Sequence, residues 1–185
     1  MTLTLDPQIQ EAAANQLQGR VGAVVVLDAK TSAVRALYSS PSYDPNPLAS
    51  LDSAVAQEAA TALEEDPSRP LDNRAIAGNR YAPGSTFKIL TALAMLEDGF
   101  TPATEVEAPV STTLPGTDTQ VSNINMSECG SGMVTLTEAF ARSCNTPFVM
   151  APAELKTGAL KDMATRFGFD QELNIPLKVT PSTFP

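Results

Sequence analysis

One segment limits the possible folds of this 185-residue chain more than any other, the nearly apolar stretch at residues 85–96. Its apolar side chains recur at helical spacing, Pro83 and Gly84 precede it, and Gly99 follows as a stop signal. A helix that is apolar on almost every side must be covered by other elements. The chain must therefore fold around this helix, with Ser85 at its N-terminus.

The rest of the chain predicts an α+β fold with one clear β-hairpin. The hairpin strands cover residues 22–27, an apolar run expected to be buried, and residues 33–38. Residues 101–132 lack sustained periodicity and indicate a long excursion with one short strand near residues 104–110. The remaining segments are predicted from alternation, caps and helical spacing: a short strand at residues 2–5, a proline-rich loop at residues 40–47, and helices at residues 7–17, 54–64, 136–142, 148–155 and 159–167.

Histidine is absent from the sequence, which excludes several kinds of active site. No Ser-His-Asp triad can form, and the usual nitrogen ligand of metal sites is missing. The only two cysteines, Cys129 and Cys144, cannot make a four-ligand zinc site and are too far apart for a C-x-x-C redox motif. We therefore expect neither a metal nor a cofactor. The net charge of −9 also makes nucleic acid an unexpected partner.

Ser85 and Lys88 offer an alternative to a histidine base. They are three residues apart at the start of the predicted helix, so their side chains lie on one face. Burial and the positive end of the helix dipole both disfavour a charged lysine there, and a neutral amine can take the serine proton. The S-x-x-K pattern by itself is weak, because it occurs by chance about once in a chain of this size. Its position at the start of an apolar helix is what strengthens it.

Ser143 and Asn145 place a hydroxyl and an amide two residues apart, directly after a helix whose capping box is Thr135 and Glu138. Alone, such a triplet is more typical of an ordinary helix C-terminus than of a site. Paired with S-x-x-K, it indicates that both side chains face the same cleft.

These segments resemble a known family. Residues 83–88, Pro-Gly-Ser-Thr-Phe-Lys, and residues 143–146, Ser-Cys-Asn-Thr, look like the S-x-x-K and S-x-N motifs of the penicillin-binding transpeptidases. Residues 3–10, 22–28, 39–46 and 135–141 are similar to the start of a transpeptidase domain of a class B penicillin-binding protein. The resemblance implies a partial penicillin-binding transpeptidase or serine β-lactamase-like fold, with a helical region and part of an antiparallel sheet. Residues 1–185 are then expected to be the N-terminal part of that domain, without its third motif and its C-terminal strands.

The resemblance also implies a role for each candidate catalytic residue. Ser85 would attack the penultimate D-Ala carbonyl of a peptidoglycan stem peptide ending in D-Ala-D-Ala, and Lys88 would activate it. Ser143 would relay a proton, and Asn145 would orient Lys88 and the substrate amide. The implied reaction is a D,D-transpeptidation that cross-links stem peptides through an acyl-serine intermediate. β-Lactams would acylate Ser85 as substrate mimics.

Other interpretations stay open. A serine β-lactamase or a β-lactam sensor shares the first two motifs, and a noncatalytic peptidoglycan-binding scaffold module would keep the fold without turnover. Lys156, Thr157 and Gly158 have the letters of the family's third motif, K-[ST]-G, but follow Asn145 by only about a dozen residues, in a segment predicted to join two helices. We therefore expect the true third motif elsewhere, for example on a separate chain that carries the rest of the domain. This chain alone is then expected to be inactive.

The expected location follows from the implied chemistry. Stem peptides are assembled outside the membrane, so the resemblance implies the extracytoplasmic face of the bacterial cell membrane. No stretch of the sequence approaches the roughly 20 apolar residues that span a bilayer, and we expect a membrane anchor outside this chain. An oxidising compartment permits a disulfide between Cys129 and Cys144, whereas the S-x-N turn constrains the direction of Cys144, so the bonded and the free states both stay open.

Overall fold

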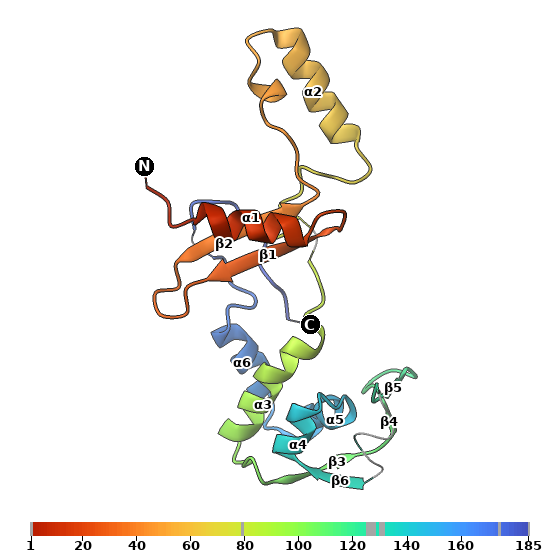
Figure 1. The fold of residues 1–185 in the computed structure, drawn as a ribbon. Helices are drawn as coiled ribbons and strands as arrows, with labels where there is room; N and C mark the ends of the chain where they lie inside the picture. The colour runs from red at the N-terminus through yellow and green to blue at the C-terminus, as the bar shows by residue number, and fades with distance from the viewer. Residues whose placement is uncertain (1, 79, 125–128, 130–131, 174, 185) are drawn as a thin grey trace. The chain divides into compact units, whose positions relative to one another are not determined.

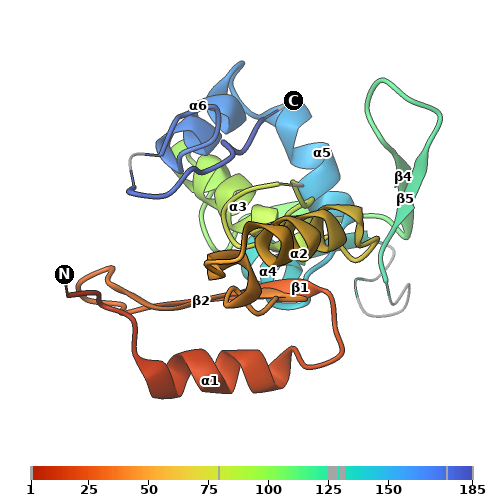
Figure 2. The same ribbon diagram turned by 90° about the horizontal axis from the view of Figure 1, so that it is seen from above.

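The computed structural model describes residues 2–78, 80–124, 129, 132–173 and 175–184. The chain divides into two compact units, the first made of Met1–Arg80 and Asn174–Thr180 and the second of Tyr81–Leu173 and Pro181–Pro185. Figures 1 and 2 show the elements of each unit. Both units contain helices and paired antiparallel strands, which confirms the predicted α+β class.

The predicted β-hairpin is present in the first unit. Strands β1 (Gly22–Leu27) and β2 (Val34–Ser40) pair antiparallel, with Val24 opposite Tyr38. The residues of β1 alternate between half-buried and exposed, and Val25 and Leu27 are 45% and 56% exposed. The prediction of a buried strand is therefore wrong for one face of β1, because no other described element covers that face within the unit.

Helix α1 (Pro7–Gln16) packs along β2 and supplies the outer edge of that strand with hydrogen-bond partners (Figure 1). Asp6 caps α1 by accepting from the amides of Gln8 and Ile9. The Gln10 carboxamide acts as a strand would, since its Nε2 donates to Leu37 O and its Oε1 accepts from Leu37 N, both at 2.9 Å.

Residues 2–5 do not form the predicted strand. The Thr4 hydroxyl donates to Val34 O at 2.7 Å, and the Asp6 amide donates to Arg35 O at 2.8 Å. Because Gln10 and these single bonds already occupy the edge of β2, a regular ladder with residues 2–5 does not form.

The loop after β2 leads into a helical segment of its own. A 3₁₀ turn, η1 (Pro47–Ala49), contacts helix α2 (Ser53–Glu65), which is N-capped by the Asp52 carboxylate. The predicted helix at residues 54–64 is thus confirmed. None of its residues is buried.

Helix α3 (Lys88–Glu97) forms the centre of the second unit. It buries Leu90, Ala94 and Met95 and runs between α5 (Thr146–Glu154) and α6 (Ala159–Arg166), as Figures 1 and 2 show, with α4 (Leu136–Ala141) also in contact. The predicted buried helix is confirmed, as are the helices predicted at residues 136–142, 148–155 and 159–167, which the structure packs against it. The first turn differs, because residues Gly84–Phe87 form a 3₁₀ turn, η2, and the α-helix begins at Lys88.

The described part of residues 101–132 forms three short strands, where one was predicted near residues 104–110, and a fourth strand begins at Gly132. β3 (Glu105–Ala108) pairs with β6 (Gly132–Thr135), and β4 (Ser111–Thr113) pairs with β5 (Gln120–Ser122). Strands of three or four residues, rich in polar side chains, are too short to show a pattern in the sequence. After β6, the Thr135 hydroxyl accepts from the Glu138 amide at 3.1 Å and caps α4 as predicted.

The segment with the letters of a third motif is not a strand. Lys156, Thr157 and Gly158 connect α5 to α6, and the Lys156 ammonium forms an ion pair with Asp98 at 2.6 Å. Across the described residues, no helix combines the length and apolarity needed to cross a bilayer.

Candidate active site

A tight turn between α4 and α5 positions Ser143 and Asn145. Cys144 N donates to Ala139 O at 2.9 Å, and α5 begins at Thr146 with Pro147 in its first turn. Ser143 has a φ of 55°, in the left-handed region that favours glycine. This conformation directs both its carbonyl oxygen and its hydroxyl toward Lys88.

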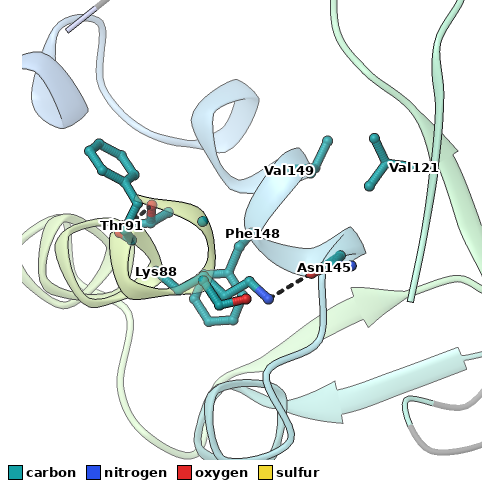
Figure 3. A pocket seen from close by; sticks show the side chains of 9 residues that line it. Lys88, Thr91, Val121, Asn145, Phe148 and Val149 are labelled. Atoms are coloured by element: carbon teal, nitrogen blue, oxygen red, sulfur yellow. Dashed lines mark hydrogen bonds between the residues drawn. The ribbon is translucent and has the colours of Figure 1, made fainter. Parts of the chain in front are cut away.

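The Lys88 ammonium lies at the centre of the candidate site (Figure 3). It donates to Ser143 O at 2.6 Å, to Asn145 Oδ1 at 2.7 Å and to Ser143 Oγ at 3.1 Å. An ammonium has three hydrogens, so these acceptors occupy all of them. Only the hydroxyl can reverse its role and donate to a neutral amine. The Lys88–Ser143 hydroxyl contact is therefore a path along which a proton can move.

Burial lowers the pKa of Lys88 from its ordinary value. The side chain is half-buried, and its ammonium lies 5.9 Å from the centroid of the Phe148 ring. None of the ion pairs among the described residues involves Lys88. The neutral form of Lys88 is therefore populated at a lower pH than the neutral form of a lysine on the surface.

The side chain of Asn145 has only one orientation that satisfies both of its neighbours. Its Nδ2 donates to Ser122 O at the end of β5, at 2.9 Å, while its Oδ1 accepts from Lys88. A flipped amide would set its NH₂ against the ammonium and its oxygen against the Ser122 carbonyl. β5 therefore orients the amide that holds Lys88.

Ser85 lies on η2 and is exposed. Together with Lys88 and Asn145 it lines a cleft of about 380 Å³, whose apolar walls include Phe148, Val121 and Val149 (Figure 3). Proton transfer from Ser85 to Lys88 requires the two to lie within hydrogen-bond reach, but none of the hydrogen bonds among the described residues joins them. The three hydrogens of the Lys88 ammonium go to Ser143 and Asn145 instead.

The structure therefore brings all four predicted residues to one site. Ser85, Lys88 and Asn145 line the cleft, and Ser143 hydrogen-bonds Lys88 without lining it. Two further residues, Val121 and Asn123, belong to the irregular excursion and carry no signal in the sequence. Val121 faces Val149 across the cleft, and the buried Asn123 contacts the turn that carries Asn145. Elsewhere in the described part of the chain, His, Cys, Asp and Glu form no group of three that could hold a metal ion.

Cys129 and Cys144 are joined by a disulfide. Both are buried, and Cys144 is the middle residue of the S-x-N turn. The question that the sequence leaves open is thus answered by a bonded pair, which ties the turn to the connection between β5 and β6.

The fold and the two motifs agree with a comparison to protein families. The penicillin binding protein transpeptidase domain matches residues 22–182 of the chain. The chain therefore belongs to the penicillin-binding protein transpeptidase domain family.

Individual relatives are consistent with this membership. The chain is 43% identical to the peptidoglycan D,D-transpeptidase PbpA of Mycolicibacterium smegmatis, over 97% of this chain and 38% of the relative. It is 33% identical to the peptidoglycan D,D-transpeptidase MrdA of Escherichia coli K12, over 95% of this chain and 27% of the relative. An imipenem acyl-enzyme structure of penicillin-binding protein A from M. tuberculosis is similar with a TM-score of 0.90 at 42% identity, covering 97% of this chain and 43% of that one. The chain thus spans less than half the length of these relatives.

Proposed function

We propose that this chain carries the nucleophile and the general base of a peptidoglycan D,D-transpeptidase. One observation carries the proposal: a half-buried lysine is held by Ser143 and Asn145 at a cleft that a serine hydroxyl also lines. A serine has little nucleophilicity until a base takes its proton, and Lys88, with its lowered pKa, is the candidate base.

In the proposed acylation, Ser85 Oγ gives its proton to the neutral Lys88 amine and attacks the penultimate D-Ala carbonyl carbon. The resulting tetrahedral oxyanion collapses, and the bond to the terminal D-Ala nitrogen breaks. That nitrogen takes a proton passed from Lys88 through the Ser143 hydroxyl, so D-Ala leaves as a neutral amine. The first transfer requires a direct Ser85–Lys88 hydrogen bond, which would form as the site tightens around a bound substrate.

Deacylation reverses these roles with a different nucleophile. The side-chain amine of a second stem peptide attacks the acyl-serine carbonyl and loses its proton toward Ser143 and Lys88. Ser85 Oγ then leaves and recovers a proton, and the new amide is the cross-link. A β-lactam would follow only the first half, because its leaving nitrogen stays tethered to the acyl group.

The relatives support this proposal by their own chemistry. Penicillin-binding protein A of M. tuberculosis has been solved as imipenem and penicillin G acyl-enzyme complexes. We extend acylation by β-lactams to Ser85 of this chain, and we propose stem peptides ending in D-Ala-D-Ala as its substrates. We also propose that the remaining motif comes from sequence outside residues 1–185.

The extracytoplasmic face of the cell membrane is the proposed location. Two observations support it: stem peptides are cross-linked there, and the buried Cys129–Cys144 disulfide suits an oxidising compartment. A membrane anchor outside this chain belongs to the same proposal. Separating the membrane and soluble fractions of the native cells, with alkaline extraction, tests it.

The decisive experiment is intact mass spectrometry of the full gene product before and after incubation with penicillin G. A stable increase of one penicillin, located on Ser85 by peptide mapping and absent from Ser85→Ala, is the expected result. A rapidly lost adduct would identify a β-lactamase instead. No adduct on the full product would indicate a noncatalytic scaffold.

A further inference from the structure

Asn123 is a deeply buried polar side chain near the candidate site. It follows β5, is 2% exposed, and has a hydrogen-bond partner for both its oxygen and its nitrogen. Burying an amide group costs free energy unless its partners are well placed. The contacts of Asn123 therefore indicate a fixed arrangement.

The partners of Asn123 lie on the turn that carries the S-x-N motif. Its Oδ1 accepts from the backbone amides of Asn145 at 2.6 Å and of Thr146 at 3.1 Å. Its Nδ2 donates to Pro109 O and to Thr146 Oγ1, both at 3.1 Å. Thr146 itself is fully buried, and its hydroxyl donates to Pro109 O at 2.8 Å.

This arrangement replaces an ordinary helix cap. The first amides of a helix have no partner within the helix, and the N-cap side chain usually accepts from one of them. Asn145 is the N-cap residue of α5 but makes no side-chain capping bond. The side-chain carboxamide of Asn145 instead accepts from Lys88 and donates to Ser122 O. Asn123, from a different segment, accepts from amides at the start of α5 in its place.

We infer that Asn123 is a positioning residue for the proposed acyl transfer: by bonding the backbone at Asn145 and Thr146, it leaves the Asn145 side chain free to hold Lys88. The inference rests on the proposed function. The Cys129–Cys144 disulfide joins the same β5–β6 connection to the same turn, so the motif is attached to it at two points.

The test compares Asn123→Ala with the parent in the full gene product. Stopped-flow acylation by penicillin G separates the dissociation constant of the initial complex from the acylation rate constant. We expect the rate constant to fall on the order of 10²-fold, as misplacement of about 1 Å can cause, and the dissociation constant to change less than threefold. Met163→Ala is the matched control, because it opens a cavity at a buried position of α6 in the same unit and removes none of the hydrogen bonds of the motif.

Hydrogen exchange of the Asn145 and Thr146 amides gives a readout that does not depend on activity. We expect both amides to exchange about tenfold faster or more in Asn123→Ala, and to stay protected in Met163→Ala. Amides that remain protected, or an acylation rate constant within twofold of that of Met163→Ala, would overturn the inference.

Asn123→Asp decides the matter if Asn123→Ala does not fold. Aspartate keeps an oxygen for both amides and loses the donor to Pro109 O and to Thr146 Oγ1. We therefore expect the amides to stay protected and the acylation rate constant to lie well above the value expected for a displaced motif. Protected amides with a rate constant reduced on the order of 10²-fold would overturn the inference. A parent protein that penicillin does not label would overturn the proposed function instead, while the amide exchange would still judge the role of Asn123.

Discussion

No carboxylate of the described ion pairs compensates a charge on Lys88. Its three acceptors are a carbonyl, an amide and a hydroxyl, all neutral. Neutral acceptors hold an ammonium in place without stabilising it as strongly as a carboxylate would. The residue is therefore fixed in position while its proton stays available.

Replacing Lys88 by arginine tests this role at the residue scale. The Lys88→Arg variant keeps a positive charge and hydrogen-bond donors but cannot lose its proton in a protein. We expect acylation by penicillin G to fall about 10²- to 10⁴-fold, the usual contribution of a general base. Lys161→Arg, an exposed exchange of the same kind on α6, should leave the rate unchanged. Rapid labelling of Lys88→Arg would exclude Lys88 as the base.

The pH dependence of acylation follows from the lowered pKa of Lys88. The amine must be neutral to accept the Ser85 proton, so the rate should rise with pH and level off above the pKa of Lys88 in the folded protein. The midpoint should lie below about 10.4, the ordinary value for lysine. A rate that is flat or falls from pH 6 to pH 9 would contradict the assignment.

The same shift has a consequence for stability. The unfolded chain binds the Lys88 proton more tightly than the folded one does. Below the pKa of Lys88 in the folded protein, this group therefore lowers the free energy of unfolding by its full amount. As pH rises from the folded toward the unfolded pKa, the cost disappears and the free energy of unfolding increases. Denaturant titrations of the parent and of Lys88→Met over this range should show the increase only in the parent.

Single residues differed in how far the sequence could place them. Ser85, Lys88, Ser143 and Asn145 were found because two short motifs coincide with helix signals. The left-handed backbone of Ser143 could not be foreseen, because serine rarely adopts it and no glycine marks the position. Nor could Asn123, whose role depends on a contact with residues about twenty positions away along the chain.

At the scale of elements, variants in the α4–α5 turn can distinguish the role of the Ser143 hydroxyl from the role of its left-handed backbone. Glycine adopts a φ of 55° without strain, whereas alanine retains the strain of a β-carbon there. We expect Ser143→Gly to be more stable than Ser143→Ala by about 1 kcal/mol, measured by urea unfolding. Both variants lack the hydroxyl and should acylate equally slowly. Normal acylation in Ser143→Gly would show that the hydroxyl does not relay a proton.

The α5–α6 connection provides a test of the K-[ST]-G-like segment at residues 156–158. The Lys156 ammonium pairs with Asp98 at the end of α3, and its backbone amide bonds the same carboxylate at 3.1 Å. These bonds lower the pKa of Asp98. We expect Lys156→Ala to label with penicillin within twofold of the parent rate. A large loss of labelling would require this segment to act in catalysis.

The helices and the strand near residues 104–110, which is β3, were predictable from the sequence, whereas β4, β5 and β6 were not. The apolar residues of 85–96 recur at helical spacing over several turns, and Thr135 marks the start of α4 as its N-cap. β4 and β5 have three residues each and are specified mainly by their pairing, which a local pattern does not contain. The cleft wall and the Asn123 contacts therefore lay outside the reach of sequence reasoning, because both depend on these strands.

For the molecule as a whole, β1 matters most. Its outer edge pairs with no strand among the described residues, and Val25 and Leu27 expose apolar area beside it. By the family resemblance, one oxyanion-hole amide would come from the strands proposed to lie outside residues 1–185, and losing one such donor costs about 10²- to 10³-fold in rate. We therefore expect the 185-residue polypeptide alone to be acylated by penicillin G at least about 10²-fold more slowly than the full gene product. Equal rates for the two proteins would show that residues 1–185 contain a complete site.

The Gln10 carboxamide on β2 sets a limit on how hairpins of this kind can associate. In polymer chemistry, a monomer with two reactive ends forms chains, and a monomer with one can form only pairs. Gln10 blocks one end, so copies of this hairpin that meet edge to edge can stop at a dimer. In Gln10→Ala the edge of β2 opens at Leu37 alone, because Thr4 and Asp6 still bond Val34 O and Arg35 O and keep the rest of that edge closed to another strand.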